Sequence, residues 1–242
     1  MYNIYYINLT RRLDRNKQMV DLLENNFKKP FNINYERIDA VDGLNLNIQE
    51  LVNSNIIIQK PPEYILKRGQ IGCSLSHINA WNLFIKSNYN YGIFFEDDIE
   101  INKQFFDETF SNTLSELEKI TFDWCYLSMG RSDTYDGIKL NKYLYIPSYV
   151  GYGTYAYILS KEGANKLLKY YNTVKIYHPV DFAYRVRHDY PKIFNEPFKY
   201  ISVYPDFLYY NYINYDKTIN KYGKDYIIYT KNIGDSDTAR IK

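Results

Sequence analysis

The sequence predicts an α/β protein with a mostly parallel central sheet covered by helices on both faces. Short runs of β-favouring residues alternate with amphipathic helical segments along much of the chain. One apolar run, within Tyr91–Glu100 (YGIFFEDDIE), ends abruptly in acidic residues, as a buried strand does where its carboxyl end meets a ligand site. At 242 residues, with no internal repeat or low-complexity linker, we expect one domain over residues 1–242.

The first predicted unit is a strand followed by a helix. Ile4–Leu9 has the composition of a buried strand, and Thr10 is placed to cap the next helix. Apolar residues recur beyond it at roughly helical spacing. They are Leu13, Val20, Leu23 and Phe27.

Polar and basic residues occupy the turn between this strand and helix. Arginines beside a helix N-terminus favour phosphate oxygens, because guanidinium groups and free backbone N–H groups both attract anions. Ordinary solvated helix charge explains the same pattern. The residues are Asn8, Arg11, Arg12 and Arg15.

The next strand, within Tyr35–Gly43, runs into Asp39, Asp42 and Gly43. Asp and Gly suit a turn, and the same side chains are able to hold a ribose or a base. The polar stretch that follows, Asn45–Tyr64, is expected to be a loop or short helical excursion over the site, because consecutive prolines forbid a continuous helix.

The stretch Arg68–Trp81 (RGQIGCSLSHINAW) has two glycines followed by a helical pattern. Gly69 and Gly72 allow close backbone approach, and Ser74 or Ser76 is expected to start the helix. We place its apolar face on aliphatic and aromatic residues, and interpret His77 as a packed core histidine rather than a ligand. The predicted face is Leu75, Ile78, Trp81 or Asn82, and Ile85.

Three consecutive carboxylates end the acidic strand. Side chains alternate along an extended chain, so Glu96 and Asp98 should point to one side and Asp97 to the other. Two acidic groups on one side suit a shared hard cation. A solvated acidic turn after a strand is the alternative.

The later segments continue the alternation. We expect a helix over Phe105–Leu117, strands over Trp124–Met129 and Thr154–Leu159, and a helix capped by Ser160. The glycines around Gly153 superficially match a dinucleotide-binding fingerprint, but the residues after them read as a strand, which excludes it.

Asp181 follows a turn that Pro179 makes rigid, which suits a catalytic base. Capping of the following helix explains it equally well. Glu162 is the second candidate base, although a helix N-terminal charge accounts for it more simply.

Composition narrows the class of function. A formal net charge of +2 and a pI near 8.2 argue against a nucleic-acid binder. The 29 tyrosines suit contacts with sugars or protein partners. Two cysteines give neither a disulfide framework nor metal-ligand spacing. With no leader-like or membrane-spanning apolar run in the sequence, we expect a soluble, intracellular protein, in a bacterial cytoplasm or a virus-infected host cell.

Several motifs in one order resemble glycosyltransferase family 25, whose members include bacterial lipooligosaccharide galactosyltransferases and collagen hydroxylysine glycosyltransferases. They span Ile7–Phe182, about three quarters of the chain, and Ser236-Asp237 loosely echoes a further one. The motifs are INLTRRLDR from Ile7, RIDAVDG from Arg37, GQIGCSLSHINAW from Gly69, FFEDD from Phe94, GTYAYILSKEGANKLL from Gly153, and PVDF from Pro179.

The resemblance implies the nucleotide-sugar fold called GT-A, a single α/β/α sandwich. It implies that Glu96-Asp97-Asp98 matches an Asp-x-Asp motif that binds the donor diphosphate through a divalent cation, usually Mn²⁺. Glu replaces the first Asp, which leaves Asp98 as the stronger candidate ligand and Glu96 as the weaker. The residues implied to line the donor pocket, beside Asp97, are Asn8, Arg11, Arg15, Ala40, Asp42, Gln70, Gly72 and Ser76.

The expected reaction is inverting transfer of galactose or glucose from UDP-galactose or UDP-glucose to a hydroxyl, with Asp181 as base. The acceptor is expected to be a glycan or a collagen-like protein, with hydroxylysine or galactosyl-hydroxylysine favoured and a lipooligosaccharide as the alternative. A catalytically inactive sugar- or collagen-binding module is a further alternative. A nucleotidyltransferase is disfavoured because no glycine-rich phosphate loop with a lysine is present. The sequence is compatible with a homo-oligomer.

Overall fold

The computed structural model describes residues 1–59, 65–101, 103–128, 137–148, 153–203 and 208–210. Its centre is an eight-stranded sheet in the order β2-β1-β3-β8-β5-β9-β7-β6, and a two-stranded sheet pairs β10 with β4. The strands are β1 (Tyr2–Asn8), β2 (Asn34–Asp39), β3 (Tyr91–Glu96), β4 (Ile99–Ile101), β5 (Trp124–Ser128), β6 (Gly137–Lys139), β7 (Leu144–Pro147), β8 (Ala156–Ser160), β9 (Tyr200–Val203) and β10 (Leu208–Tyr210).

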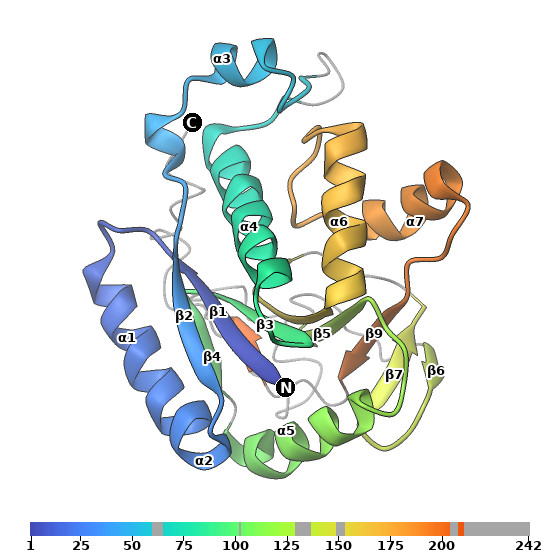
Figure 1. The fold of residues 1–242 in the computed structure, drawn as a ribbon. Helices are drawn as coiled ribbons and strands as arrows, with labels where there is room; N and C mark the ends of the chain where they lie inside the picture. Colours follow the sequence, from blue (N-terminus) through green and yellow to red (C-terminus); the bar gives the residue numbers. More distant parts are fainter. Residues whose placement is uncertain (60–64, 102, 129–136, 149–152, 204–207, 211–242) are drawn as a thin grey trace, which may run out of the picture.

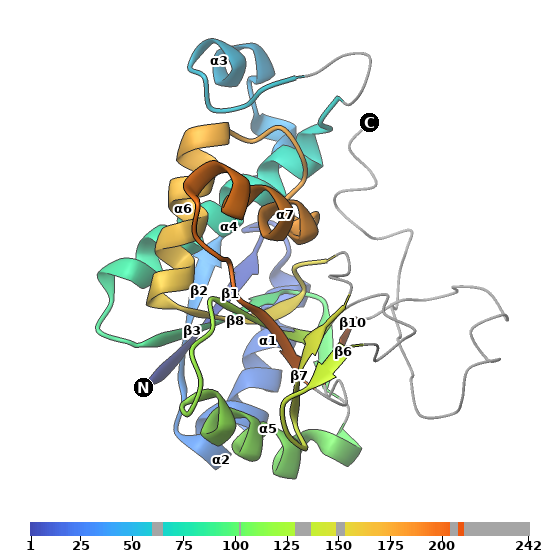
Figure 2. The same cartoon turned by 90° about the vertical axis from the view of Figure 1, so that its right-hand side faces the viewer.

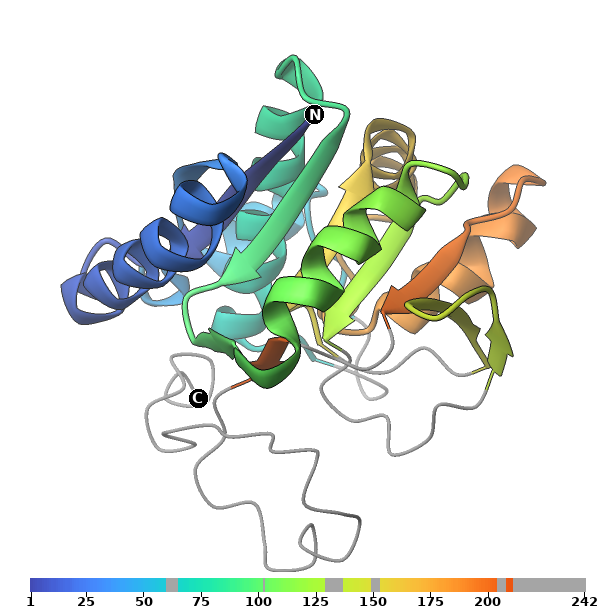
Figure 3. The ribbon, with the colours of Figure 1, turned by 90° about the horizontal axis from the view of Figure 1, so that it is seen from below.

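Helices cover both faces of the large sheet, with α4, α6 and α7 on one side and α1, α2 and α5 on the other (Figure 1 and Figure 3). The predicted α/β class is therefore confirmed. The helices are α1 (Leu13–Leu23), the π-helical turn η1 (Glu24–Lys28), α2 (Lys29–Phe31), the 3-10 turn η2 (Gly43–Asn45), α3 (Ile48–Asn53), α4 (Arg68–Lys86), α5 (Lys103–Leu117), α6 (Lys161–Val174) and α7 (Ala183–Phe194).

The large sheet is mixed rather than mostly parallel. β1 pairs in parallel with β2 and β3, and β5 with β9. The pairings β3–β8, β5–β8, β6–β7 and β7–β9 are antiparallel. The expectation of a mostly parallel sheet holds only for the first half of the chain, where strands and crossover helices alternate.

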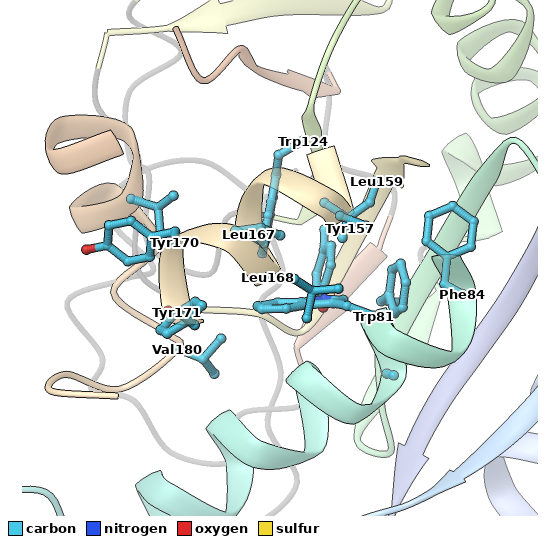
Figure 4. Close-up of a cluster of buried hydrophobic side chains, with 14 of the residues drawn as sticks. Trp81, Phe84, Trp124, Tyr157, Leu159, Leu167, Leu168, Tyr170, Tyr171 and Val180 are labelled. Atoms are coloured by element: carbon cyan, nitrogen blue, oxygen red, sulfur yellow. The ribbon is translucent and has the colours of Figure 1, made fainter. Parts of the chain in front are cut away.

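Alternation along the strands divides the core into two clusters, one on each face of the sheet. Tyr5 and Phe94 pack beneath α4 and α6, while Tyr6 and Phe95 face α1 and α5. On the α4 side, aromatic side chains from separate elements converge on Tyr157 (Figure 4). The indole of Trp124 stacks on the Tyr157 ring with centroids 4.0 Å apart.

Several helix boundaries differ from the sequence-based expectation. Thr10 does not cap α1, because the N-cap position is Arg12 and no side chain caps it. α4 begins at Arg68, well before Ser74 and Ser76, and the Gln70 side chain accepts a hydrogen bond from the Lys67 N–H at its start. Ser160 does cap α6, accepting a hydrogen bond from the Gly163 N–H at 3.0 Å.

The buried face of α4 also differs from the predicted one. Ile71, Ala80, Trp81 and Phe84 are buried together with Gly72, Ser74, Ser76 and His77, whereas Leu75, Ile78 and Ile85 are only partly buried. The polar side chains take the inward positions because Ser74 and Ser76 hydrogen-bond to neighbouring loops and His77 hydrogen-bonds to Tyr157 of β8. Because the prediction placed aliphatic residues on the buried face of α4, the predicted face is rotated about the helix axis from the observed one.

The excursion between β2 and α4 contains η2 and α3, as expected of a short helical segment. In Figure 2, α3 lies beyond the end of α4, away from the sheet. Within the described residues, every helix is too short or too polar to cross a membrane. Residues 60–64, 149–152 and the Ser236-Asp237 motif lie outside the described residues.

A buried ion pair fixes α6 to the sheet. Lys166 Nζ lies 3.0 and 3.1 Å from the two Asp123 carboxylate oxygens, and Asp123 also accepts from the Lys199 N–H at 2.7 Å. Burial acts to raise the pKa of Asp123, and these hydrogen bonds only partly oppose it. The first turn of α6 consequently sits directly against the Asp123 backbone.

Gly163→Ala should destabilise the protein by about 2–3 kcal/mol, because a Cβ there would lie 2.0 Å from the Asp123 carbonyl oxygen. Asn172→Ala, at an exposed position of the same helix, should change stability by no more than about 0.5 kcal/mol. Denaturant midpoints of the two variants measure this difference. Equal midpoints would contradict the prediction, because they would mean that α6 moves away from the Asp123 carbonyl with no loss of stability.

Candidate active site

Several elements bring polar side chains to one edge of the large sheet. β1, β2 and β3 run parallel, so their last residues, Asn8, Asp39 and Glu96, lie at the same edge. β8 runs antiparallel to β3, and Ala156 at its start pairs with Phe95. Thr154 therefore lies beside the acidic end of β3. This edge corresponds to the usual ligand-binding edge of an open α/β sheet.

Asp97, the middle carboxylate, is buried and bound by two side chains. Asn8 Nδ2 donates to Asp97 Oδ2 at 2.6 Å, and Arg15 Nη1 donates to Asp97 Oδ1 at 2.7 Å. Burial raises the pKa of Asp97, and the charge of Arg15 opposes that rise. Arg15 Nη1 also lies 3.6 Å from Asp98 Oδ2. The arginine therefore lies between the second and third carboxylates.

Asn8 uses its whole amide inside the protein. Its Nδ2 also donates to the Arg12 carbonyl oxygen at 3.2 Å, and its Oδ1 accepts from Arg37 Nε at 3.1 Å. The side chain is almost completely buried. Asn8 thus links β1, β2 and the acidic end of β3, and its described hydrogen bonds all go to protein atoms.

The turn after β2 packs against α4. Ser76 Oγ accepts from the Val41 N–H at 2.8 Å and donates to the Gly72 carbonyl at 2.6 Å. A Cβ on Gly72 would lie 2.6 Å from the Val41 carbonyl oxygen, which explains a glycine at this position. The structure therefore brings these two predicted pocket residues together with the Ala40–Gly43 turn.

Ala40, Arg11 and Asp42 lie in or beside the same turn, whereas the Gln70 side chain accepts from the Lys67 N–H at the start of α4. The Ala40 N–H donates to the Asn8 carbonyl at 3.0 Å. Arg11 Nε donates to Asp42 Oδ2 at 2.7 Å, and although burial acts to raise the pKa of Asp42, this bond leaves it lowered. Their role toward a donor stays a prediction.

Glu96 points to a different set of partners from Asp97. Thr154 Oγ1 lies 2.7 Å from Glu96 Oε1 and 2.9 Å from Asp181 Oδ1. His77 Nε2 lies 3.4 Å from the same Glu96 oxygen. The histidine is buried, as predicted, and its Nδ1 lies 2.7 Å from the Tyr157 hydroxyl. Two carboxylates from separate elements therefore meet at one threonine.

Asp181 has the character of a proton acceptor near neutral pH. Burial, and next the charge of Glu96, raise its pKa to about 6. Its backbone carbonyl accepts from the Gly153 N–H at 3.0 Å. The capping alternative is wrong, because Phe182 occupies the N-cap position of α7 and no side chain caps it. Glu162 is exposed in the first turn of α6 and pairs with Lys166, which fits a helix charge.

Cys73, His77 and Glu96 place potential metal-ligand atoms within 4.8 Å of one another, a grouping that the cysteine count did not predict. Burial, followed by the charges of Glu96 and Asp181, raises the pKa of Cys73 well above its usual value, which keeps it a thiol. Neither Cys73 nor Cys125 forms a disulfide in the described part of the chain. Sequence reasoning also missed Thr154, because a single threonine before a strand carries no chemical signal of its own.

Asn8→Asp should destabilise the protein by at least about 3 kcal/mol at pH 8, because it sets a second carboxylate against buried Asp97. The loss should shrink at pH 5, where the mutant pair can retain a proton. Asn25→Asp, exposed and beside Lys29, should stay within about 0.5 kcal/mol of the wild type. Denaturant midpoints at both pH values test this. A pH-independent loss would contradict it.

The chain is similar to proteins that act on procollagen. Procollagen galactosyltransferase 1-A of Xenopus laevis is 31% identical over 198 residues, which are 77% of this chain and 31% of the relative. Probable inactive glycosyltransferase 25 family member 3 of Bos taurus is 29% identical over 178 residues, 68% of this chain and 28% of the relative. The chain thus spans about a third of the length of these relatives.

A bacterial relative and a solved structure extend the comparison. A putative glycosyltransferase of Haemophilus influenzae is 28% identical over 170 residues, 68% of this chain and 56% of the relative. A glycosyltransferase involved in the glycosylation of the major capsid of PBCV-1 aligns with a TM-score of 0.48 and 10% identity, covering 83% of this chain and 80% of that one. A likeness at this level carries no structural inference.

The family comparison is decisive. The model described as glycosyltransferase family 25 (LPS biosynthesis protein) matches residues 1–184. This range contains β1 to β8 and every residue placed above at the sheet edge, from Asn8 to Asp181. The chain therefore belongs to glycosyltransferase family 25.

Proposed function

We propose that this chain is a metal-dependent, inverting glycosyltransferase that moves galactose or glucose from a UDP-sugar to a hydroxyl group. The observation that carries the proposal is the meeting of the acidic end of β3 with the partly buried Asp181 at one sheet edge. Family membership supports the reaction class. The GT-A fold, which the family resemblance implies, is consistent with the helix-covered sheet.

The donor set at this edge fits a hard divalent cation such as Mn²⁺. Asp98 is the proposed ligand, because Asp97 already binds Asn8 and Arg15 through both oxygens. Glu96 is the second predicted ligand, but its Oε1 already lies close to the Thr154 hydroxyl and to His77 Nε2, which makes it the weaker candidate. When bound, the cation would act as a Lewis acid and stabilise the charge that develops on the leaving diphosphate.

The protein's own residues supply the rest of the mechanism. Asp181 accepts the proton of the attacking acceptor hydroxyl, which an ionised carboxylate with a pKa near 6 can do at neutral pH. The acceptor attacks the anomeric carbon from the face opposite the diphosphate, and the anomeric configuration inverts. Arg11, in the turn before α1, is exposed enough to approach a phosphate while it contacts Asp42.

The acceptor proposal follows the relatives. The relatives named procollagen galactosyltransferases favour a collagen-like chain, for which we propose hydroxylysine as the acceptor residue, whereas the family description favours a lipopolysaccharide. UDP-galactose and UDP-glucose should be tested with Mn²⁺ against a hydroxylysine peptide, its galactosylated form and a lipooligosaccharide core. Transfer to one of the peptides supports the collagen-like acceptor, and transfer to the core supports the other.

A binding module without catalysis is the second candidate, because one relative is named probable inactive. Its signature would be measurable binding of a glycan or collagen peptide with no transfer and no donor hydrolysis for any UDP-sugar. The acceptor panel therefore distinguishes the two functions in one set of measurements.

Asp98→Ala should reduce transfer by about a hundredfold or more, because cation stabilisation of the leaving group amounts to several kcal/mol. The variant should fold normally, since Asp98 lies at the sheet edge. Asp21→Ala, an exposed acid in α1, should leave transfer unchanged. Turnover and Mn²⁺ titration of the two variants test the assignment. Near-normal turnover by Asp98→Ala would remove Asp98 from the cation site.

Asp181→Asn should keep donor binding and lose about a hundredfold or more in turnover. It should also stabilise the fold by about 1–3 kcal/mol at pH 7. Because the folded pKa of Asp181 is raised from 3.8 to about 6, the stability of the wild type falls as pH rises through that window. The gain from the substitution should therefore vanish below pH 4.

Asp189→Asn is the matched control and should shift stability in the opposite direction. Burial acts to raise the pKa of Asp189, but hydrogen bonds from His188 and Tyr177 outweigh it and leave the pKa lowered. Kinetics at pH 7 and denaturant midpoints at pH 4 and 7 provide the measurements. Unchanged turnover in Asp181→Asn would remove Asp181 as the base.

A further inference from the structure

The Thr154 hydroxyl lies between the two carboxylates of this sheet edge. Its distances are 2.7 Å to Glu96 Oε1 and 2.9 Å to Asp181 Oδ1, and the residue is completely buried. The three residues come from the end of β3, the approach to β8 and the segment before α7. A single hydroxyl thus connects three chain segments that are distant in sequence.

The backbone on either side of Thr154 is bound to the same two segments. The Gly153 N–H donates to the Asp181 carbonyl at 3.0 Å, and the Glu96 N–H donates to the Tyr155 carbonyl at 3.0 Å. These bonds hold the threonine backbone relative to both carboxylates. The Thr154 side chain therefore starts from a fixed place between the Glu96 and Asp181 carboxylates.

Glu96 also lies beside the core. Trp81 Nε1 donates to the Tyr157 hydroxyl at 2.9 Å, which leaves that hydroxyl able to donate to His77 Nδ1 at 2.7 Å. In this arrangement the His77 proton lies on Nε2, which faces Glu96 Oε1 at 3.4 Å without forming a hydrogen bond. Figure 4 shows Trp81 beside Tyr157 in the aromatic cluster. The packed interior therefore fixes the imidazole that borders Glu96.

The segment carrying Asp181 is held from α4. The Val180 N–H donates to Ser74 Oγ at 3.0 Å, so the backbone before Asp181 is fixed. Among the described residues, the hydrogen bond to the Asp181 carboxylate comes from Thr154, and it forms when the single hydroxyl proton points to Asp181 Oδ1 and not to Glu96 Oε1. Rotation of this side chain about its own bonds is consequently restrained by the threonine rather than by the backbone.

We propose that Thr154 is a positioning residue, which holds the Asp181 carboxylate in its reactive orientation by donating its one hydroxyl proton to Asp181 Oδ1. The inference rests on the proposed function, in which Asp181 takes the acceptor proton. The threonine itself touches no reacting atom.

Thr154→Val and Thr154→Ser separate the hydroxyl from the shape of the side chain. Valine keeps the volume and loses the hydroxyl, so kcat should fall about 10- to 100-fold while the donor KM changes less than about threefold. Serine keeps the hydroxyl and should restore kcat to within about threefold of the wild type. A purely structural role would not produce this division between kcat and KM with rescue by serine.

Thr113→Val is the matched control. Thr113 is also completely buried, and its hydroxyl has no hydrogen-bond partner within the described part of the chain. The same chemical change there should leave kcat and KM unchanged. Steady-state kinetics of the four proteins with a UDP-sugar and the acceptor found in the panel provide the comparison.

Two kinetic results would overturn the inference: unchanged kcat in Thr154→Val, or equal losses in the valine and serine variants. Crystal structures of the wild type and Thr154→Val give a readout that does not depend on activity. The Asp181 carboxylate should turn away from Glu96 in the valine variant, and an unchanged position would also overturn the inference. If the wild type transfers no sugar, the proposed function fails, while this structural comparison still decides whether Thr154 positions Asp181.

Discussion

The hydrogen-bonded burial of Asp97 is the interaction on which the site depends. An ionised carboxylate in this position is stable only with compensating donors, and Asn8 and Arg15 provide one for each oxygen. Asn8 ends β1 and Arg15 lies in α1, so the first β-α unit fixes the acidic end of β3. The parallel pairing of β1 with β3 brings these groups to the same level of the sheet.

Once Asp97 is fixed, its neighbours diverge toward different environments. Glu96 meets the core through His77 and meets Asp181 through Thr154, whereas Asp98 lies near the Arg15 guanidinium. Three adjacent carboxylates thus acquire three different sets of partners. Electrostatic repulsion among them is reduced because the Arg15 guanidinium lies beside both Asp97 and Asp98, whereas Glu96 faces Thr154 and His77.

The first half of the fold could be predicted from sequence, because β1, α1, β2 and β3 have strong local periodicity. The antiparallel insertion of β8 could not, since strand direction is set by distant pairing and not by the residues of β8. At the site, Asp181 and the acidic end of β3 could be predicted because they are carboxylates that follow a rigid turn and a buried strand. Thr154 and the inward face of α4 could not, because Ser74 and Ser76 are buried to bind loop N–H groups and His77 is buried against Tyr157 of β8.

Tyr157 explains why site and core form one unit. Its ring stacks on Trp124 and Phe94, and its hydroxyl contacts Trp81 and His77. A tyrosine can serve both environments because only one end of its ring is polar. Aromatic packing on the α4 side of the sheet therefore fixes His77, whose Nε2 lies 3.4 Å from Glu96 Oε1. A change in this core acts first on the hydrogen bond between Tyr157 and His77, and so on the imidazole that borders the carboxylates.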